Sequence, residues 1–137
     1  MHATLNVTEV RAKFSEFIDR VVREKPQLVK RNRDVVTTIS LSHMNDLLMV
    51  YEFTMEYEET DEGFVGSIEQ IDDIIGSGKS IEDLKLNLAE QLIEYAEDYY
   101  NDFSKYYNAP NRRAHYPYIF RILIQNDVES VRDLIHA

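Results

Sequence analysis

The fold of the first third of this chain is decided by the stretch from Ala3 to Leu48, which reads ATLNVTEVRAKFSEFIDRVVREKPQLVKRNRDVVTTISLSHMNDLL. Residues 4–7 alternate in polarity and predict a short strand. The apolar residues that follow recur every three or four positions, so they lie on one face of an amphipathic helix. These residues are Val10, Phe14, Phe17, Ile18, Val21 and Val22. The pattern predicts a strand followed by a helix that buries one face.

The ends of these elements carry their own signals. Thr8 is expected to cap the helix, because a threonine hydroxyl can accept a hydrogen bond from a first-turn backbone N–H. Pro26 ends it, since the residue before a proline avoids the helical region. Two β-rich runs at 27–31 and 35–40 are joined at Asn32-Arg33-Asp34, which predicts a hairpin. Ser42 is expected to cap a last short helix.

The period of the apolar pattern changes at Tyr51. From there apolar and acidic residues alternate strictly, which predicts a half-buried strand with a solvated acidic face. A turn at residues 61–63, a second strand at 64–68 and a third at 71–75 complete a three-stranded antiparallel sheet. Residues 76–78 read as a flexible loop. Ser80 is expected to cap a long helix from Ile81 to about Phe103 whose buried stripe is Ile81, Leu84, Leu88, Leu92, Tyr95 and Tyr99.

The tail after Asn108 is helical. Pro117 can occupy the first position of one helix, and a further helix starts at Asn126 or Asp127. The sequence therefore predicts an α+β protein with two domains, residues 1–50 and 51–137. The boundary rests on the change of period and on a change of charge.

Charge is distributed unevenly along the chain. Residues 1–50 carry eight Lys/Arg and six Asp/Glu, a net of +2, whereas residues 51–137 carry seven and nineteen, a net of −12. A mildly basic end suits nucleic acid, and an acidic body suits a basic protein. The competing interpretation is that the acidic excess only keeps the protein soluble.

Composition limits location and assembly. The chain has no cysteine, so it has no disulfide framework, which fits a reducing cytoplasm. No apolar run approaches the roughly 20 residues that span a bilayer, and the N-terminus lacks a signal-peptide core. We expect a cytoplasmic protein that does not bind membranes. A domain of about 50 residues buries little surface by itself, so a homodimer or higher homo-oligomer is expected.

Residues 4–48 resemble the Phd/YefM antitoxins in the short strand, in Thr8-Glu9-Val10-Arg11 and in Leu28-Val29-Lys30-Arg31 after Pro26. The hairpin lacks that family's usual glycine. The resemblance implies a dimer that binds operator DNA through the start of the first helix and the basic hairpin strand. The DNA contacts carried over are Arg11 and Arg31, with Lys13, Lys30 and Arg33 nearby. The alternative is that these are solvated surface cations.

Residues 51–100 look like the HicB antitoxin fold, through Asp61-Glu62-Gly63-Phe64-Val65 and Gly78-Lys79-Ser80-Ile81-Glu82-Asp83-Leu84. The resemblance implies a degenerate ribonuclease-H-like domain, without catalytic carboxylates, that sequesters a toxin. The tail resembles extensions of some HicB-like proteins, and its residues 106–137 receive no assigned role. The toxin-binding candidates are Glu94, Glu97, Asp98, Asp102, Arg112 and Arg113.

Catalytic and cofactor sites are not predicted. Gly76-Ser77-Gly78-Lys79-Ser80 lacks the first glycine of a phosphate-binding loop, and Asp73 in its place would repel phosphate. The four histidines show no metal-ligand spacing, so we expect no metal, no cofactor and no enzyme.

Together these features predict an antitoxin of a type II toxin–antitoxin system that binds a cognate toxin, expected to be a basic ribonuclease, and represses its own operon. One alternative is a stand-alone transcriptional regulator with a different sensing domain. The other is a small metal-dependent nuclease using Glu56, Glu58 and Asp61. The alternation of apolar and acidic residues, however, predicts that the two glutamates face solvent.

Overall fold

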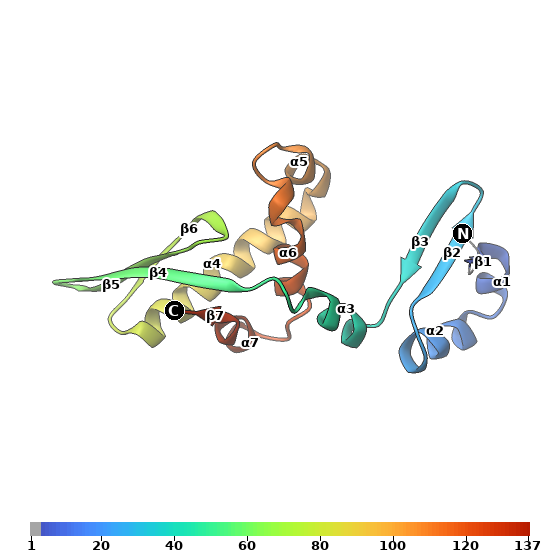
Figure 1. Ribbon diagram of the computed structural model, residues 1–137, viewed down its shortest axis with the longest axis horizontal. Coiled ribbons are helices and arrows are strands. Elements are labelled where there is room, and N and C mark those ends of the chain that lie inside the picture. The colour runs from blue at the N-terminus through green and yellow to red at the C-terminus, as the bar shows by residue number, and fades with distance from the viewer. Residues whose placement is uncertain (1–3) are drawn as a thin grey trace. The chain divides into compact units, whose positions relative to one another are not determined.

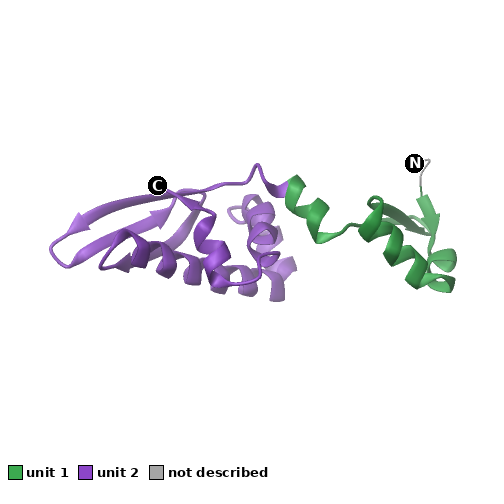
Figure 2. Ribbon diagram, turned by 90° about the horizontal axis from the view of Figure 1, so that it is seen from below, with its two compact units in different colours: residues 1–47 green, residues 48–137 purple. Residues whose placement is uncertain are grey.

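The computed structural model describes residues 4–137. The chain divides between Leu47 and Leu48 into two compact units, unit 1 (Met1–Leu47) and unit 2 (Leu48–Ala137) (Figure 2). Each unit has its own hydrophobic core. None of the described helices is both long and apolar enough to cross a membrane.

Unit 1 contains a three-stranded sheet of order β1-β2-β3 with two helices between its first two strands. Strand β1 runs parallel to β2, and β2 runs antiparallel to β3. The strands and helices are β1 (Thr4–Asn6), α1 (Val7–Ala12), α2 (Phe14–Arg23), β2 (Gln27–Arg31), β3 (Asp34–Thr38) and α3 (Leu41–Leu48), whose last residue lies in unit 2 (Figure 1). The predicted order of strand, helix, hairpin and helix is confirmed.

Two details of the first helix differ from the prediction. Helix α1 begins at Val7, and its N-cap is Asn6, whose side-chain Oδ1 accepts a hydrogen bond from the backbone N–H of Thr8 at 2.7 Å. The prediction of Thr8 as the cap was wrong, because Thr8 already lies within the first turn. The single predicted helix is also interrupted at Lys13, which has φ −132° and ψ 51° and separates α1 from α2.

The interruption divides the predicted apolar face. Val10, Phe17 and Val21 are buried with Val29 of β2, and Leu5 packs against them. The other three residues of the predicted stripe, Phe14, Ile18 and Val22, are exposed. They follow one another at four-residue spacing along α2. The expectation that all six form one buried face was wrong for these three.

The β2–β3 hairpin turns at Asn32 and Arg33, and the turn is one residue shorter than predicted because Asp34 belongs to β3. Asn32 has φ 55°, a left-handed conformation that asparagine tolerates better than most non-glycine residues. This explains how the hairpin forms without glycine. Helix α3 begins at Leu41, and the Ser40 hydroxyl accepts from the backbone N–H of His43 at 3.2 Å, so the prediction of Ser42 as its cap was wrong.

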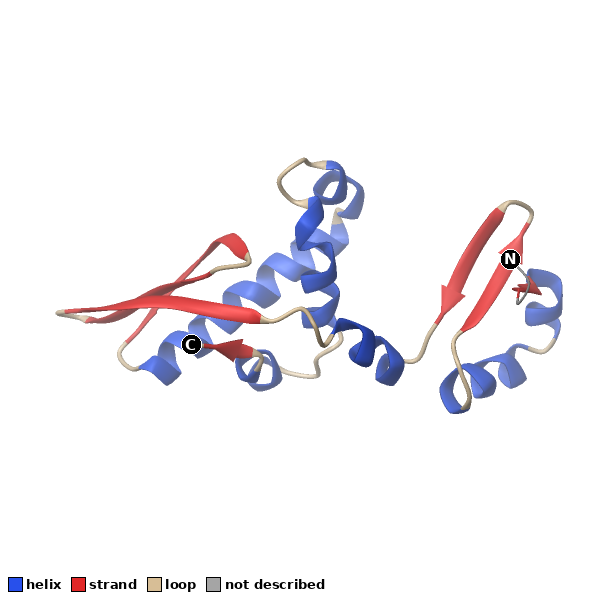
Figure 3. Cartoon of the chain, viewed as in Figure 1, coloured by secondary structure: helices blue, strands red, loops and turns tan. Residues whose placement is uncertain are grey.

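Unit 2 contains a four-stranded sheet of order β6-β5-β4-β7. The predicted three-stranded antiparallel sheet is confirmed, and a fourth strand, parallel to β4, was not predicted. The strands are β4 (Phe53–Thr60), β5 (Gly63–Ile68), β6 (Ile71–Gly78) and β7 (Ile135–His136). The helices are α4 (Ile81–Asn101), α5 (Phe103–Asn108), the 3-10 helix η1 (Arg113–His115), α6 (Tyr116–Leu123) and α7 (Val128–Asp133) (Figure 3).

Residues 76–78 belong to β6 and not to a flexible loop as predicted. Both glycines face the long helix. A Cβ added at Gly76 would lie 2.6 Å from Oδ1 of Asn87, and one at Gly78 would collide with the backbone N of Leu84. The glycines are therefore required for the close approach of α4 to the sheet.

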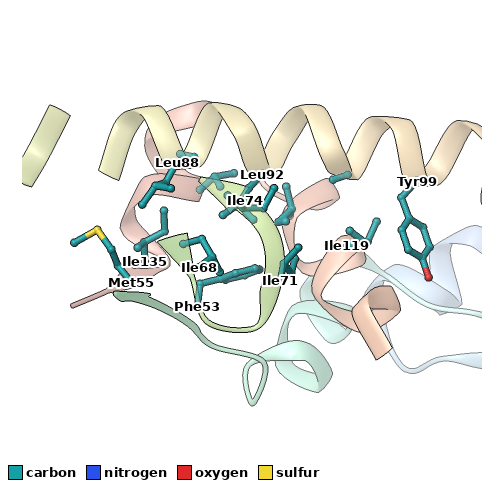
Figure 4. Close-up of a cluster of buried hydrophobic side chains, with 14 of the residues drawn as sticks. Phe53, Met55, Ile68, Ile71, Ile74, Leu88, Leu92, Tyr99, Ile119 and Ile135 are labelled. Atoms are coloured by element: carbon teal, nitrogen blue, oxygen red, sulfur yellow. The ribbon is translucent and has the colours of Figure 1, made fainter. Parts of the chain in front are cut away.

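Helix α4 supplies the centre of the unit 2 core. Its N-cap is Ser80, as predicted, with the hydroxyl accepting from the backbone N–H of Asp83 at 3.1 Å. Leu84, Leu88, Leu92 and Tyr99 are fully buried, while Ile81 and Tyr95 of the predicted stripe are partly buried. The sheet contributes Phe53, Met55, Ile68, Ile71 and Ile74, and the tail contributes Ile119, Ile122, Val131 and Ile135 (Figure 4). The tail thus completes this core.

Candidate functional site

The candidate DNA-binding residues of unit 1 lie on two segments. Arg11 is in the last turn of α1, and Lys13 is the residue between α1 and α2. Lys30 and Arg31 end β2, and Arg33 lies in the turn that follows. All five are exposed. Exposure leaves their charges available to phosphate or base edges.

Strand pairing places the start of α1 beside Lys30. The parallel register of β1 on β2 sets Asn6 opposite Lys30, and Asn6 is also the N-cap of α1. Helix α1 packs against both strands. The beginning of α1 therefore lies beside the basic end of β2. The resemblance implied that Arg11 lies at the start of the helix, but Arg11 is in the last turn of α1 and Lys13 follows it, so this register does not place either residue beside Lys30.

A carboxylate shares the hairpin with these cations. Oδ2 of Asp34 lies 3.6 Å from Nη2 of Arg31, and the two side chains are 75% and 70% exposed. Exposed ion pairs of this kind stabilise proteins by only about 0–1 kcal/mol. The pair leaves Arg31 free to move to another anion, but Asp34 reduces the positive potential at the hairpin.

Unit 1 also presents apolar side chains to solvent. Phe14, Ile18 and Val22, which we name the α2 stripe, are 58%, 36% and 57% exposed, and Val36 of β3 is 58% exposed. Contiguous apolar side chains on a small soluble unit commonly mark a protein interface. Periodicity alone could not find this feature, because residues buried in a core and residues buried between subunits share the same spacing.

In unit 2, the acidic candidates lie on the outer face of α4. Glu94, Glu97 and Asp98 are exposed, and Asp102 is the exposed residue between α4 and α5. The spacing of three and four residues places them along one side of the helix. Glu97 also lines a groove of about 300 Å³ between α4 and the tail, with Ile93, Leu123 and Val128. The acidic side of α4 thus borders apolar surface.

An aromatic patch adjoins the end of the same helix. Its members Tyr100, Phe103, Tyr107, Tyr116 and Phe120 are linked by ring contacts with centroid distances of 5.3–6.4 Å. Tyr100 is 57% exposed and Tyr116 is 40% exposed. Tyrosines that expose both ring and hydroxyl are favoured at protein interfaces, where they also stack on arginine.

The remaining two candidates, Arg112 and Arg113, make contacts within unit 2. Arg112 forms an ion pair with Asp73, and its Nη1 donates to the Tyr95 hydroxyl at 2.9 Å. Its backbone carbonyl accepts from the Tyr99 hydroxyl at 2.8 Å. The Nε of Arg113 donates to the Tyr107 carbonyl at 3.1 Å, and its guanidinium lies 4.4 Å from the Tyr107 ring centroid. Both arginines therefore attach the tail to α4 and α5.

Tyr95 extends this network to His115, whose Nδ1 lies 2.7 Å from the tyrosine hydroxyl. Because that hydroxyl accepts from Arg112, its own proton is free to donate to Nδ1, which requires a neutral imidazole. Burial lowers the pKa of His115 from its ordinary value, and the charge of Arg112 lowers it further. Burial likewise raises the pKa of Tyr95, despite its hydrogen bond from Arg112.

The three carboxylates of the nuclease alternative lie in a different region. Glu56 and Glu58 are exposed on β4, and Asp61 is in the turn between β4 and β5. Among residues 4–137, no group of three or more His, Cys, Asp and Glu side chains is arranged to hold a metal ion.

The comparisons with known proteins agree with one another. A crystal structure from Syntrophomonas wolfei subsp. wolfei, described as the antitoxin part of a proposed toxin/antitoxin system, is similar to this chain at a TM-score of 0.92. The two are 45% identical, and the match covers 98% of this chain and 96% of that one. No curated protein matches. The model of the PHD-like family, described as antitoxin of RelE/RelB toxin–antitoxin systems, matches residues 1–137. The chain therefore belongs to this family of antitoxins.

Proposed function

We propose that the chain binds and neutralises a cognate toxin through unit 2 and represses its own operon by binding DNA through unit 1. In this account unit 1 is of the Phd/YefM type and unit 2 is HicB-like. The observation that carries the proposal is the separation of charge between the two units. Residues 48–50 are uncharged, so the net charges of +2 and −12 are those of the units themselves.

The proposed DNA-binding form is a homodimer. The α2 stripe supplies apolar surface that a second copy can cover, and one unit 1 alone has too little positive charge for firm DNA binding. Two copies double the number of cations that face the phosphates. A two-fold dimer predicts a palindromic operator whose half-sites are contacted by Arg11 and Arg31 of each copy.

The proposed toxin partner is a basic protein, which we expect to be a ribonuclease. Glu94, Glu97 and Asp98 offer it an acidic helix face, and the adjoining aromatic patch offers rings on which arginine side chains can stack. Asp102 lies between these two features. Arg112 and Arg113 contribute by holding the tail, and thereby the aromatic patch, in position.

The DNA-binding half of the proposal is tested by fluorescence anisotropy with the DNA upstream of the gene. Arg31→Ala should weaken binding about 5- to 150-fold, the range for loss of one base contact, or lower the salt dependence if Arg31 contacts phosphate. Arg23→Ala is the matched control, because Arg23 is exposed at the end of α2, which leads into the start of β2 and not into the hairpin turn. Equal binding by Arg31→Ala and the wild type would remove the hairpin from the proposed interface.

A further inference from the structure

Strand β4 is paired along only part of one side. Its inner neighbour β5 pairs with residues from Met55 to Thr60, whereas β7 on the other side pairs with Phe53 and Thr54 alone. No other described strand continues the sheet beyond β7. Figure 1 shows the β4–β5 hairpin extending past β7. The outer side of β4 from Met55 to Thr60, which we name the β4 edge, is therefore open.

The antiparallel pairing fixes which backbone groups face outward. The carbonyl of Thr54 accepts from the N–H of Glu69 at 2.9 Å, so even-numbered residues of β4 direct their backbone groups toward β5. Hydrogen-bonding direction alternates along a strand. Tyr57 and Glu59 consequently direct their N–H and C=O groups away from the sheet. These four groups can pair with an added strand.

One backbone group on the opposite edge of the sheet is covered by a side chain. The backbone N–H of Ser77 in β6 donates to the Asn87 side chain of α4 at 3.0 Å. Open edges are otherwise prone to pair with foreign strands, so proteins commonly cover them. The β4 edge has no such cover from the described residues, and only its side chains restrict what can bind.

Those side chains exclude a second copy and favour a basic partner. Glu56, Glu58 and Glu59 are all exposed at the edge. Pairing β4 with β4 of another copy would place these acidic strands side by side, and like charges across a strand pair are destabilising. A partner strand that carries Lys or Arg would instead be attracted to these carboxylates. Glu56 and Glu58 also border a depression of about 360 Å³ on the outer sheet face, with Val65, Ser67 and Ile75.

We infer that the β4 edge binds an extended, lysine- or arginine-bearing segment of the toxin as an additional strand of the sheet. The backbone of that segment pairs with Tyr57 and Glu59. Its alternate side chains lie beside Glu56 and Glu58 and extend over β4 toward Val65 of β5. This inference rests on the proposed toxin-binding function of unit 2 and adds a backbone contact to the acidic face of α4.

The test uses the full-length chain and the product of the gene adjacent to its own. Amide hydrogen exchange is measured by NMR for the free chain and for the purified complex. The amide hydrogens of Tyr57 and Glu59 should exchange at least about tenfold more slowly in the complex, because each gains a backbone acceptor. The amides of Glu56 and Glu58 are the internal control, since both already pair with β5 in the free chain.

Charge reversal provides a second readout. The pair E56K and E58K should raise the dissociation constant of the complex at least about tenfold, the effect expected for lost charge complementarity at a contact. A Lys pair at Glu82 and Glu90, exposed on α4 outside the proposed contacts, makes the same charge change and should have a smaller effect. If the complex forms but the amides of Tyr57 and Glu59 keep their exchange rates, the inference is wrong and the proposed function stands. If no complex forms, both are wrong.

Discussion

Nη2 of Arg31 and Oδ2 of Asp34 lie 3.6 Å apart across the β2–β3 hairpin, each on an exposed side chain. Asp34 thus places a negative charge beside the cation proposed to contact DNA. We predict that Asp34→Asn tightens operator binding several-fold and changes the free energy of unfolding by less than about 1 kcal/mol. Anisotropy titration and urea denaturation measure the two effects. Asp19→Asn is the control, because Asp19 is an exposed residue of α2. Unchanged or weaker binding by Asp34→Asn would contradict the assignment of Arg31 to the DNA interface.

If the α2 stripe forms the homodimer interface, a charged side chain introduced into it should disrupt the dimer. Val22 is 57% exposed, so Val22→Asp should leave the fold of a single copy intact. Burying the new carboxylate between two copies would cost free energy, so we expect the dimer to dissociate and operator binding to weaken. Sedimentation velocity measures the dimer. Arg23→Gln, at an exposed position on the side of α2 opposite the stripe, lowers the net charge by the same amount and should remain dimeric. A dimeric Val22→Asp protein would place the interface elsewhere.

The amount of structure predictable from sequence differed between the two units for a physical reason. Helix α4 is long and amphipathic, and its stripe packs on one sheet, so Ser80, Leu84, Leu88 and Leu92 were predicted correctly. Helix α2 has apolar residues on two sides, one against the sheet and one exposed. Sequence period does not distinguish these two sides, and the full six-residue stripe was therefore assigned to the core.

Other features depend on contacts between distant residues. The two-residue strand β7 has too few positions to show alternation, and it forms only because Phe53 and Thr54 offer an edge. Arg112 was a candidate for toxin contact, yet it pairs with Asp73 and Tyr95, which are far away in sequence. Gly76 and Gly78 were read as loop residues because their close approach to α4 leaves no local pattern.

Tyr95 connects Arg112 and His115 through one hydroxyl group. Tyr95→Phe removes the acceptor of Arg112 and the partner of His115, both within a partly buried network. We predict a loss of about 1–3 kcal/mol in the free energy of unfolding, because polar groups are left without partners. Tyr100→Phe, which removes a hydroxyl from an exposed ring, should change stability by less than about 0.5 kcal/mol. Urea denaturation compares the two, and equal stabilities would show that the network contributes nothing.

His115 predicts a pH dependence of stability. Its folded pKa lies below the ordinary value of 6.5, chiefly because it is buried. Below pH 6.5 the unfolded chain therefore binds a proton more readily than the folded chain, so stability falls as pH falls. The stabilisation by neutral His115 is fully present above the pKa of the unfolded chain. It is lost as the pH falls from there through the lower pKa of the folded chain.

This effect is isolated by comparing the wild type with His115→Gln, which retains a polar side chain but cannot be protonated. Relative to His115→Gln, the wild type should lose unfolding free energy as the pH is lowered from about 7.5 to about 5.5. The acidic side chains titrate alike in both proteins and cancel in this comparison. A difference that is independent of pH would mean that His115 is not held neutral by the fold.

Unit 2 is proposed to use its acidic surface to neutralise a toxin. The most direct measurement is the growth of cells that express the adjacent gene together with the full-length chain or its variants. We predict that the adjacent gene alone stops growth, that this chain restores it, and that a variant with Glu94→Lys, Glu97→Lys and Asp98→Lys does not. The proposed function of unit 2 would be contradicted if the adjacent gene had no effect on growth, or if the charge-reversed variant restored growth as well as the wild type.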